Sequence, residues 1–574
     1  MTDLTSAAGP SQPKKQKIND IGIDAKILQL SEKNAFSFYE STNDEDYGWD
    51  SRSESEGDSD IAMDTVETVY SETDSETEDN TEPQQLSVIR GSSLVDWETG
   101  SNCMVFHPFT KTESLLIQPT ECTPFGYFRL FLTNEFLQKI VEETNHYAIE
   151  MLHSDKTKEK SRITSWKDLE VDEFLVFLGV FLQMGNVKMN RFQDYWKKDP
   201  LFHNTGIANC ISRNRFLLIL HALYFVKDTA PGEPQPTDKL YKIRPIIDFF
   251  NKRMCEVYYP NRELCLDEPL VLWGGRLFHQ YIKNKKHKCG IKLYFLSTSS
   301  GVVQKIAIHT GLLDDYRWKN HAHKIVLHLL NEKLNVGHHV FMDSYYNSFD
   351  LAKLLLDKKT HCTGTLRMTR KNIPKDVQTT KLQKGNTVER YCHGVMIGKW
   401  KDKHEECYIS TEYKNEMVKV SNKRNEIKQE PLPLIIYNAF MSRVGRQDQM
   451  LSYYLSERKS LQWYKKLFIH VIEVIVINSH ALYNKYSGSK ISLYDYRLNI
   501  IKSLLPSMEE QKSAPKNLKH ILSKRELPPG KTKVQRKRCK SCSYQGKRTD
   551  TTYVCYDCPD QPGYCLNCCE IYHK

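Results

Sequence analysis

The C-terminal part of the sequence concentrates residue types that bind metal ions. Seven of the 16 cysteines lie between Cys539 and Cys569: six form three Cys-x2-Cys pairs, the seventh directly follows the third pair, and a histidine comes after it. Thiolates and imidazoles at this spacing are zinc ligands, and two tetrahedral Zn²⁺ ions need eight of them. We therefore expect a closed structural module with two zinc ions, although the adjacent Cys568 and Cys569 leave open which eight residues bind. The candidate ligands are Cys539, Cys542, Cys555, Cys558, Cys565, Cys568, Cys569 and His573.

Basic residues precede and interrupt this cysteine-rich segment. They are Lys531, Lys533, Arg536, Lys537, Arg538, Lys540, Lys547 and Arg548. Lysine and arginine beside a small folded module can make phosphate contacts, whose strength falls as salt rises. A solvated linker is the alternative explanation for some of these charges. The predicted DNA-binding residues are Lys533, Arg536, Lys537 and Arg538.

Two aspartates, Asp267 and Asp343, each end a short apolar run. Cleavage of phosphodiester bonds with two Mg²⁺ ions needs several carboxylates that converge on the metals, because hard cations take oxygen ligands. A side chain at the end of a buried strand can leave the core and enter a cleft. Taken alone, an aspartate at the end of a strand is more often a turn or capping residue, so the pair is a hypothesis that needs further support.

The elements that would position these aspartates are strands alternating with helices. The expected strands are 263–266, 291–297, 302–309 and 338–342, with the second and third joined as a hairpin. The expected helices lie within 127–141, 172–178, 215–220, 349–356 and 463–483. This order predicts an α/β or α+β core inside a helical shell.

Charge is distributed unevenly along the chain. Residues 44–82 hold sixteen acidic residues and one arginine, which gives this segment a charge of −15. Since the whole chain carries +10, the rest of the chain carries +25. The acidic region lacks regular apolar spacing, and we expect residues 1–105 to be disordered and open to kinase or chromatin partners. A strongly basic remainder is typical of a protein that binds nucleic acid. The first residues lack a secretory signal and no stretch approaches the roughly 18 uninterrupted apolar residues of a membrane span.

Several stretches, in this order, resemble piggyBac transposases. LCLDE at 264–268, with Gly-Arg at 275–276, resembles the first catalytic motif of that family. FMDSYYNS at 341–348 resembles the second, and TGTLR at 363–367 resembles its Gly-Thr-x-Arg stretch. Further matches are Tyr195-Trp196, Lys242 to Pro245, Asp448-Gln449-Met450 and the helix 463–483 with Asn478-Ser479. The likeness covers roughly residues 120–574.

The resemblance implies an α/β fold, with an RNase H-like core inserted in a helical dimerisation and DNA-binding domain, followed by a cross-brace zinc-binding domain. It also implies a nuclear homodimer whose partner is DNA and not a membrane. Asp267 and Asp343 are then the catalytic residues, and Mg²⁺ is the cofactor if the protein is catalytically active. The expected boundaries are 118–262 and 450–505 for the helical domain, 263–367 and 433–449 for the core, 368–432 for an insertion, 506–538 for a basic linker and 539–574 for the zinc-binding domain.

One departure from the family pattern changes the functional prediction. The third catalytic aspartate begins a Val-Asp-x-x-Asp-Gln stretch in the family, but Gly445 stands at that position here. Asp448 lies three residues further on, which puts it on roughly the same side of a helix. It is the remaining candidate for the third ligand. We predict a transposase-derived DNA-binding protein with impaired catalysis. The alternatives are an active cut-and-paste transposase that uses Asp267, Asp343 and Asp448, and a protein-interaction zinc module.

Two further features favour a structural explanation. His338 and His339 are adjacent on a predicted strand, where neighbouring side chains point to opposite faces. We therefore expect one packed and one exposed histidine rather than a metal pair. Trp463 and Tyr464 are expected to pack in a core or an interface rather than to stack on bases.

Overall fold

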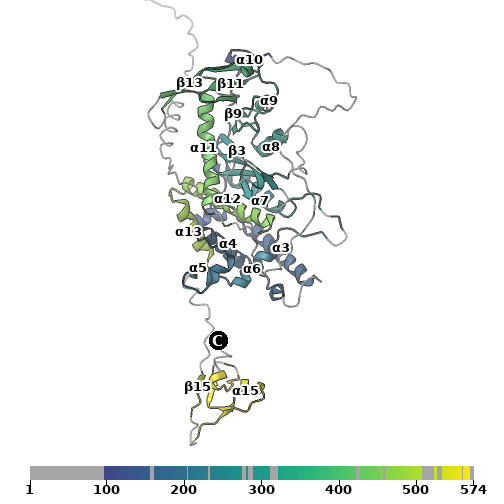
Figure 1. The fold of residues 1–574 in the computed structure, drawn as a ribbon, viewed down its shortest axis with the longest axis vertical. Helices are drawn as coiled ribbons and strands as arrows, with labels where there is room; N and C mark the ends of the chain where they lie inside the picture. The colour runs from purple at the N-terminus through teal and green to yellow at the C-terminus, as the bar shows by residue number, and fades with distance from the viewer. Residues whose placement is uncertain are drawn as a thin grey trace, which may run out of the picture. The chain divides into compact units, whose positions relative to one another are not determined.

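A computed structural model gives the fold of the chain (Figure 1). It describes residues 96–574, apart from 155–160, 203, 230–232, 235, 274–278, 282–288, 311–320, 422–426, 455, 457–460, 507–521, 527–532, 557, 559 and 569–574. The side chains of 205, 272, 279–281, 289 and 444–448 are also outside the description. The expectation of disorder for residues 1–105 therefore falls almost entirely on residues that the structure does not describe.

The helices are α2 (Pro124–Arg129), α3 (Asn134–His153), α4 (Val171–Asn186), α5 (Thr205–Ala208), α6 (Arg213–Ala222), α7 (Arg244–Val257), α8 (His321–Leu330), α9 (Phe349–Asp357), α10 (Lys375–Thr379), α11 (Leu432–Tyr453), α12 (Trp463–Tyr486), α13 (Leu493–Leu504) and α15 (Lys540–Tyr544). Short 3-10 helices are η1 (Ser101–Cys103), η2 (Arg162–Ser165), η3 (Phe192–Trp196) and η5 (Asn331–Lys333).

The strands are β1 (Ser114–Leu115), β2 (Tyr258–Tyr259), β3 (Glu263–Asp267), β4 (Leu270–Leu272), β5 (His279–Tyr281), β6 (Cys289–Thr298), β7 (Val303–Ile308), β8 (His339–Met342), β9 (His361–Thr365), β10 (Thr387–Cys392), β11 (Val395–Lys401), β12 (Glu405–Ser410), β13 (Met417–Ser421), β14 (Ile427–Pro431), β15 (Leu522–Lys524), β16 (Lys537–Arg538), β17 (Asp550–Thr551) and β18 (Tyr553–Cys555).

One mixed sheet forms the centre of the fold. The strands β3, β8 and β9 run parallel to one another, and β6 pairs antiparallel with β3 on one edge and with β7 on its other edge. The sheet continues beyond β9 through the antiparallel strands β12, β11 and β10. All four strands predicted from the sequence are present, as β3, β6, β7 and β8.

The segment expected as an insertion, 368–432, contributes strands to the central sheet and to a separate hairpin. Its strands β10, β11 and β12 join the central sheet next to β9. The hairpin of β13 and β14 is separate, because residues 417–430 do not belong to the compact unit that the described residues of 99–416 and 431–574 form.

Helices pack against one another and against β6 and β7 in a large hydrophobic cluster. The helix α11 contacts β3, β8, β9 and β12 and then meets α12 (Figure 1). The expected helical stretch 127–141 is two helices rather than one, because Thr133 caps the start of α3 by accepting a hydrogen bond from the N–H of Phe136. The other predicted helices are present as α4, α6, α9 and α12.

The helix α12 is the central helix of the core. It is long and apolar enough to cross a membrane, but 83% of its most apolar 18-residue window is buried inside the protein. Tyr464 is 3% exposed and packs edge-on against Tyr224, so the expected packing role is confirmed for this tyrosine. Arg497 of α13 forms a buried ion pair with Glu473 of α12 and also donates to the carbonyl oxygen of Leu182 in α4. This arginine ties three helices together.

The expectation that one of two adjacent histidines would be exposed is wrong. His338 and His339 are both 0% exposed. The ring of Phe109 lies 4.7 Å from that of His338, and Tyr413 lies 5.2 Å from that of His339. Protein therefore covers both side chains.

Candidate functional site

The two predicted catalytic aspartates end neighbouring parallel strands. Glu263 pairs with His339, and Cys265 pairs with Phe341, in the register of β3 and β8. Continuing this register by two residues places Asp267 next to Asp343. Both carboxylates emerge from fully buried strand residues and are themselves only partly buried. The structure thus brings together the pair that the sequence singled out.

The turn after Asp343 is fixed by hydrogen bonds. The N–H of Tyr345 donates to Oδ1 of Asp343 at 2.9 Å, and Nδ2 of Asn347 donates to the carbonyl oxygens of Met342 at 2.8 Å and Thr365 at 3.0 Å. A Cβ atom at Gly364 would lie 1.8 Å from the oxygen of Met342. Only glycine therefore fits opposite this turn.

A third carboxylate, Glu268, lies beside the pair. The hydroxyl of Tyr346 donates to its Oε1 at 2.7 Å, and Nζ of Lys292 lies 3.1 Å from its Oε2. Burial raises the pKa of Asp343 above its ordinary value, and the charge of Glu268 raises it further. The N–H of Tyr345 and the charge of Lys292 oppose this shift. The charges of Glu268 and Lys292 therefore both act on the pKa of Asp343, in opposite directions.

The helix α11 lies against the strands that carry the aspartates. The ring of Phe440 stacks on that of Phe341 at 4.5 Å. Burial raises the pKa of the Tyr437 phenol to about 12, and the nearby charge of Asp343 contributes to this shift. Gly445 and Asp448 belong to the same helix, but their side-chain positions fall outside the described residues. The geometry of the third predicted catalytic residue, Asp448, is therefore not described.

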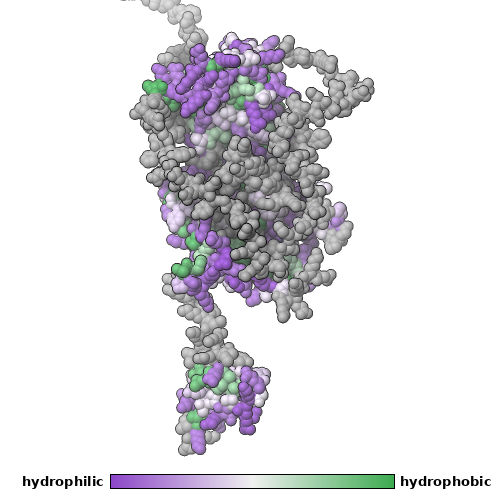
Figure 2. Space-filling view, viewed as in Figure 1, coloured by the Kyte–Doolittle hydropathy of each residue, from purple (hydrophilic) through white to green (hydrophobic). Residues whose placement is uncertain are grey.

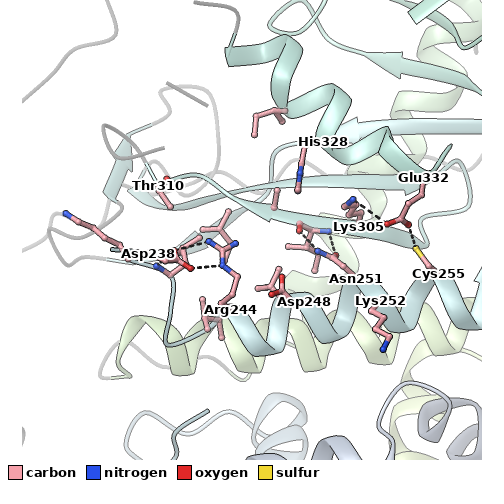
Figure 3. Close-up of a pocket in the computed structure, with 18 of the residues that line it drawn as sticks. Asp238, Arg244, Asp248, Asn251, Lys252, Cys255, Lys305, Thr310, His328 and Glu332 are labelled. Carbon is pink, nitrogen blue, oxygen red and sulfur yellow. Dashed lines mark hydrogen bonds and ion pairs between the residues drawn. The ribbon is translucent and has the colours of Figure 1, made fainter. Parts of the chain in front are cut away.

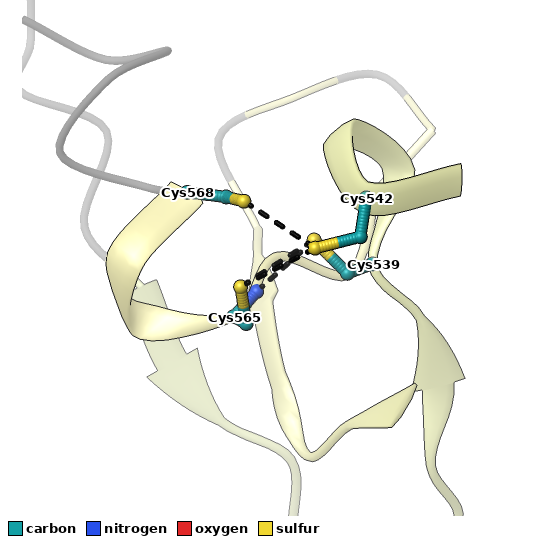
Figure 4. A group of neighbouring side chains, drawn as sticks. All are labelled: Cys539, Cys542, Cys565 and Cys568. Atoms are coloured by element: carbon teal, nitrogen blue, oxygen red, sulfur yellow. Dashed lines mark hydrogen bonds between the residues drawn. The ribbon is translucent and has the colours of Figure 1, made fainter. Parts of the chain in front are cut away.

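The tail brings four cysteines together from two of the three pairs. The Sγ atoms of Cys539, Cys542, Cys565 and Cys568 all lie within 4.8 Å of one another (Figure 4). Three of the Sγ–Sγ separations are 3.6, 3.8 and 3.8 Å. Tetrahedral zinc with bonds of about 2.3 Å requires sulfur atoms about 3.8 Å apart, so the donor set fits zinc.

The remaining predicted zinc ligands divide into two groups. Cys555 is buried and Cys558 is half-buried, and neither belongs to the four-cysteine cluster. Cys569 and His573 lie outside the described residues. Pairing of the first Cys-x2-Cys unit with the third, across the second, is the arrangement expected of a cross-brace. Of the adjacent Cys568 and Cys569, only Cys568 is described, and it belongs to the first cluster.

Most of the predicted DNA-binding residues are exposed on the tail. Lys533, Arg536 and Arg538 are exposed, whereas Nζ of Lys537 donates to the carbonyl oxygen of Gln561 at 2.9 Å. Lys540, Lys547 and Arg548 are exposed as well. The visible face of the tail carries both hydrophilic and hydrophobic residues (Figure 2). Among the described residues of the tail, the exposed large apolar and aromatic side chains are Tyr544, Tyr556 and Leu566.

A cavity of about 820 Å³ lies elsewhere, between α7, β7 and α8 (Figure 3). Its charged groups pair with one another: Asp238 with Arg244 at 2.8 Å, and Lys305 with Glu332 at 3.9 Å. Neither predicted catalytic aspartate lines it. The cavity is therefore separate from the carboxylate site.

Sequence reasoning gave no role to Lys292 or Tyr346, and it noted Glu268 only as part of a motif. One signal was present for Lys292, because a lysine stands between Ile291 and Leu293 in an otherwise apolar strand. No local signal pairs Lys292 with Glu268, since the two residues belong to different strands.

Comparison with known proteins gives a consistent result. The family model described as Transposase IS4 matches residues 123–480. The chain is 26% identical over 403 residues to the human PiggyBac transposable element-derived protein 3, an alignment that covers 66% of this chain and 64% of that protein. It is 24% identical over 389 residues to the human PiggyBac transposable element-derived protein 2, covering 64% and 62%. The alignments therefore span less than two thirds of either relative.

A solved structure shares the fold. The cryo-electron microscopy structure of a piggyBac transposase synaptic complex with hairpin DNA matches with a TM-score of 0.63 at 21% identity. The match covers 80% of this chain and 100% of the solved chain. At this identity the likeness concerns the fold alone.

Proposed function

Since this chain belongs to the piggyBac family of transposases, we propose that it is a transposase-derived nuclear DNA-binding protein whose DNA-cleaving activity is impaired. The observation that carries the second part is Gly445, which stands where the family has its third catalytic aspartate. Glycine offers no side-chain oxygen to a metal ion. The helix that carries it, α11, packs on the strands that hold Asp267 and Asp343.

The topology supports an RNase H-like catalytic core. The spatial order β7-β6-β3-β8-β9 combines an antiparallel three-strand part with two further strands parallel to β3. We propose that the helices before β3 and after α11 form the dimerisation and DNA-binding domain, with the boundaries expected from the sequence.

Asp267 and Asp343 would hold divalent metal in this core. Their carboxylate oxygens are the ligands that Mg²⁺ prefers, and the register of β3 and β8, continued by two residues, supports a position side by side. When bound, Mg²⁺ supplies Lewis-acid stabilisation of the attacking and leaving oxygens in phosphodiester cleavage. The turn from Asp343 to Asn347 orients one ligand, and α11 packs against the strands that lead to both aspartates. With a glycine at 445, this site has two charged ligands, Asp267 and Asp343, but lacks the third charged ligand of the family pattern.

DNA binding is proposed chiefly through the tail. The four-cysteine cluster supports a first zinc ion, and Cys555 and Cys558 would contribute to a second. Exposed Lys533, Arg536 and Arg538 support phosphate contacts beside this module. A protein-interaction role for the tail is the alternative, and exposed Tyr544 and Leu566 favour it.

An active transposase is the second candidate for the core. The observation that favours it is Asp448, which lies on α11 one helical turn after Gly445. If Asp448 replaces the lost ligand, the wild-type chain should cleave DNA and Asp448→Asn should abolish that cleavage.

The test measures metal-dependent cleavage by the full-length, zinc-loaded protein on a library of candidate terminal repeats. We expect little cleavage by the wild type and a gain with Gly445→Asp, because the substitution returns a carboxylate to the cleft. Gly445→Asn is the matched control, since it changes the helix similarly without adding a charge. Robust wild-type cleavage that Asp448→Asn removes would refute impaired catalysis.

A further inference from the structure

A buried ion pair adjoins the two aspartates. Glu268 directly follows Asp267, and both of its oxygens are engaged, Oε1 by the hydroxyl of Tyr346 and Oε2 by Nζ of Lys292 at 3.1 Å. The side chains of Lys292 and Glu268 are 10% and 16% exposed. Such a pair is only weakly screened by solvent, so both charges act on their surroundings.

The position of the lysine charge is fixed by aromatic rings. Nζ of Lys292 lies 4.5 Å from the ring centroid of Tyr345 and 5.0 Å from that of Tyr294. Tyr345 belongs to the turn that begins at Asp343, so the lysine is held at the border of the carboxylate site. A cation between aromatic faces and a carboxylate has little freedom to move away.

We propose that Glu268 and Lys292 form a built-in charge pair that sets the divalent-metal affinity of Asp267 and Asp343. This inference rests on the proposed metal site. Glu268 attracts a divalent cation to the neighbouring aspartates, and Lys292 offsets that attraction. Neither residue needs to touch the metal, so both are positioning residues.

The proposal predicts the direction in which two substitutions change the affinity for a divalent metal. Lys292→Met keeps the length of the side chain and its packing between the rings, but leaves the charge of Glu268 uncompensated. Glu268→Gln keeps an oxygen for the hydroxyl of Tyr346, but leaves the charge of Lys292 uncompensated. Even at the dielectric constant of water, one charge about 6 Å away changes the affinity for a divalent ion by about tenfold, so tenfold is the smallest change expected.

The experiment measures Mn²⁺ binding by electron paramagnetic resonance in full-length, zinc-loaded protein. We expect Lys292→Met to bind Mn²⁺ at least about tenfold more tightly than wild type, and Glu268→Gln at least about tenfold more weakly. The double variant should return to within about threefold of wild type, because it restores neutrality. A purely structural role would weaken binding in both single variants, and that result would overturn the proposal.

Asp343→Asn separates this inference from the proposed function. If Asp343→Asn leaves the Mn²⁺ affinity of the Lys292→Met protein unchanged, the metal is not at this site and the proposed metal site fails with the inference. If Asp343→Asn removes binding but the two single charge variants shift affinity in the same direction, the metal site stands and the charge-pair inference alone fails. No binding in any variant, including Lys292→Met, overturns both.

Discussion

The side-chain amide of Asn478 pairs with both main-chain polar atoms of Val303. Its Oδ1 accepts from the N–H of Val303 at 2.9 Å, and its Nδ2 donates to the carbonyl oxygen of Val303 at 2.9 Å. Asn478 lies on α12, and Val303 begins β7 at an edge of the sheet. Asn251 of α7 makes the same pair of bonds to Ile306 further along β7. Two helices thus cap an edge strand that would otherwise expose unpaired backbone groups.

Asn478→Leu should destabilise the core. It leaves the N–H and the carbonyl of Val303 buried without these partners, which costs about 2–4 kcal/mol of unfolding free energy. Urea unfolding followed by tryptophan fluorescence measures the loss. Asn499→Leu, at an exposed position on α13, is the matched control and should change the unfolding free energy by less than about 0.5 kcal/mol. Equal effects of the two substitutions would contradict the capping role.

Gly364→Ala should disrupt the carboxylate site. The added Cβ would lie 1.8 Å from the oxygen of Met342 and 2.5 Å from Nδ2 of Asn347, so the strand or the turn must shift. We expect a loss of about 3 kcal/mol or more in unfolding free energy, or failure to accumulate soluble protein. Gly100→Ala is the control, because no atom lies within 4 Å of its added Cβ. A folded, stable Gly364→Ala protein would show that the turn can move.

Stability should fall as the pH decreases from about 6.5 toward 4. Burial lowers the pKa of His338 and of His361 to about 4 from the ordinary value of 6.5. The folded state keeps both imidazoles neutral, and Nε2 of His361 accepts from the N–H of His107. The unfolded chain takes up protons below about pH 6.5, so stability is intact above that pH and is lost as the pH falls toward the folded value. Each imidazole accounts for roughly 2 kcal/mol at pH 5.

Urea midpoints measured between pH 7.5 and 4.5 test this dependence. His361→Gln keeps an acceptor for the N–H of His107 but cannot titrate, so its stability should vary less with pH than that of the wild type. His404→Gln, at an exposed position, should keep the wild-type slope. An unchanged slope in His361→Gln would mean that this imidazole takes up its proton over the same pH range in the folded and the unfolded protein.

Metal analysis of the full-length protein should find about two zinc ions per chain. Cys542→Ala removes one member of the four-cysteine cluster and should reduce the content to about one. Cys122→Ser, at an exposed cysteine outside the tail, should leave the content unchanged. Retention of two zinc ions by Cys542→Ala would contradict the assignment of this cluster.

DNA affinity should fall steeply with salt. Arg538→Gln should reduce the slope of log affinity against log salt by about 0.9 for each phosphate contact that it removes. Lys537→Gln also breaks the hydrogen bond to Gln561, so its effect combines charge with tail structure. The control is Lys111→Gln, which changes an exposed lysine that is far from the tail in the sequence. An identical slope in Arg538→Gln would leave this arginine as part of a solvated linker.

The sequence alone determined the local elements and the chemistry of the candidate sites. Apolar runs that end on Asp267 and Asp343 predicted strands that the structure contains as β3 and β8. Cysteine spacing predicted a metal module, and the order of motifs indicated the family that the Transposase IS4 match supports. These inferences hold because strand propensity and ligand type are properties of a few neighbouring residues.

The tertiary structure decided which distant residues meet. Pairing of β3 with β8 places Asp267 beside Asp343, and folding of the tail selects Cys568 for the first cluster. The partnership of Glu268 with Lys292 and the full burial of His338 and His339 depend on which elements cover which face. Contacts between residues far apart in the chain follow from packing of the whole core, and no local pattern in the sequence encodes them.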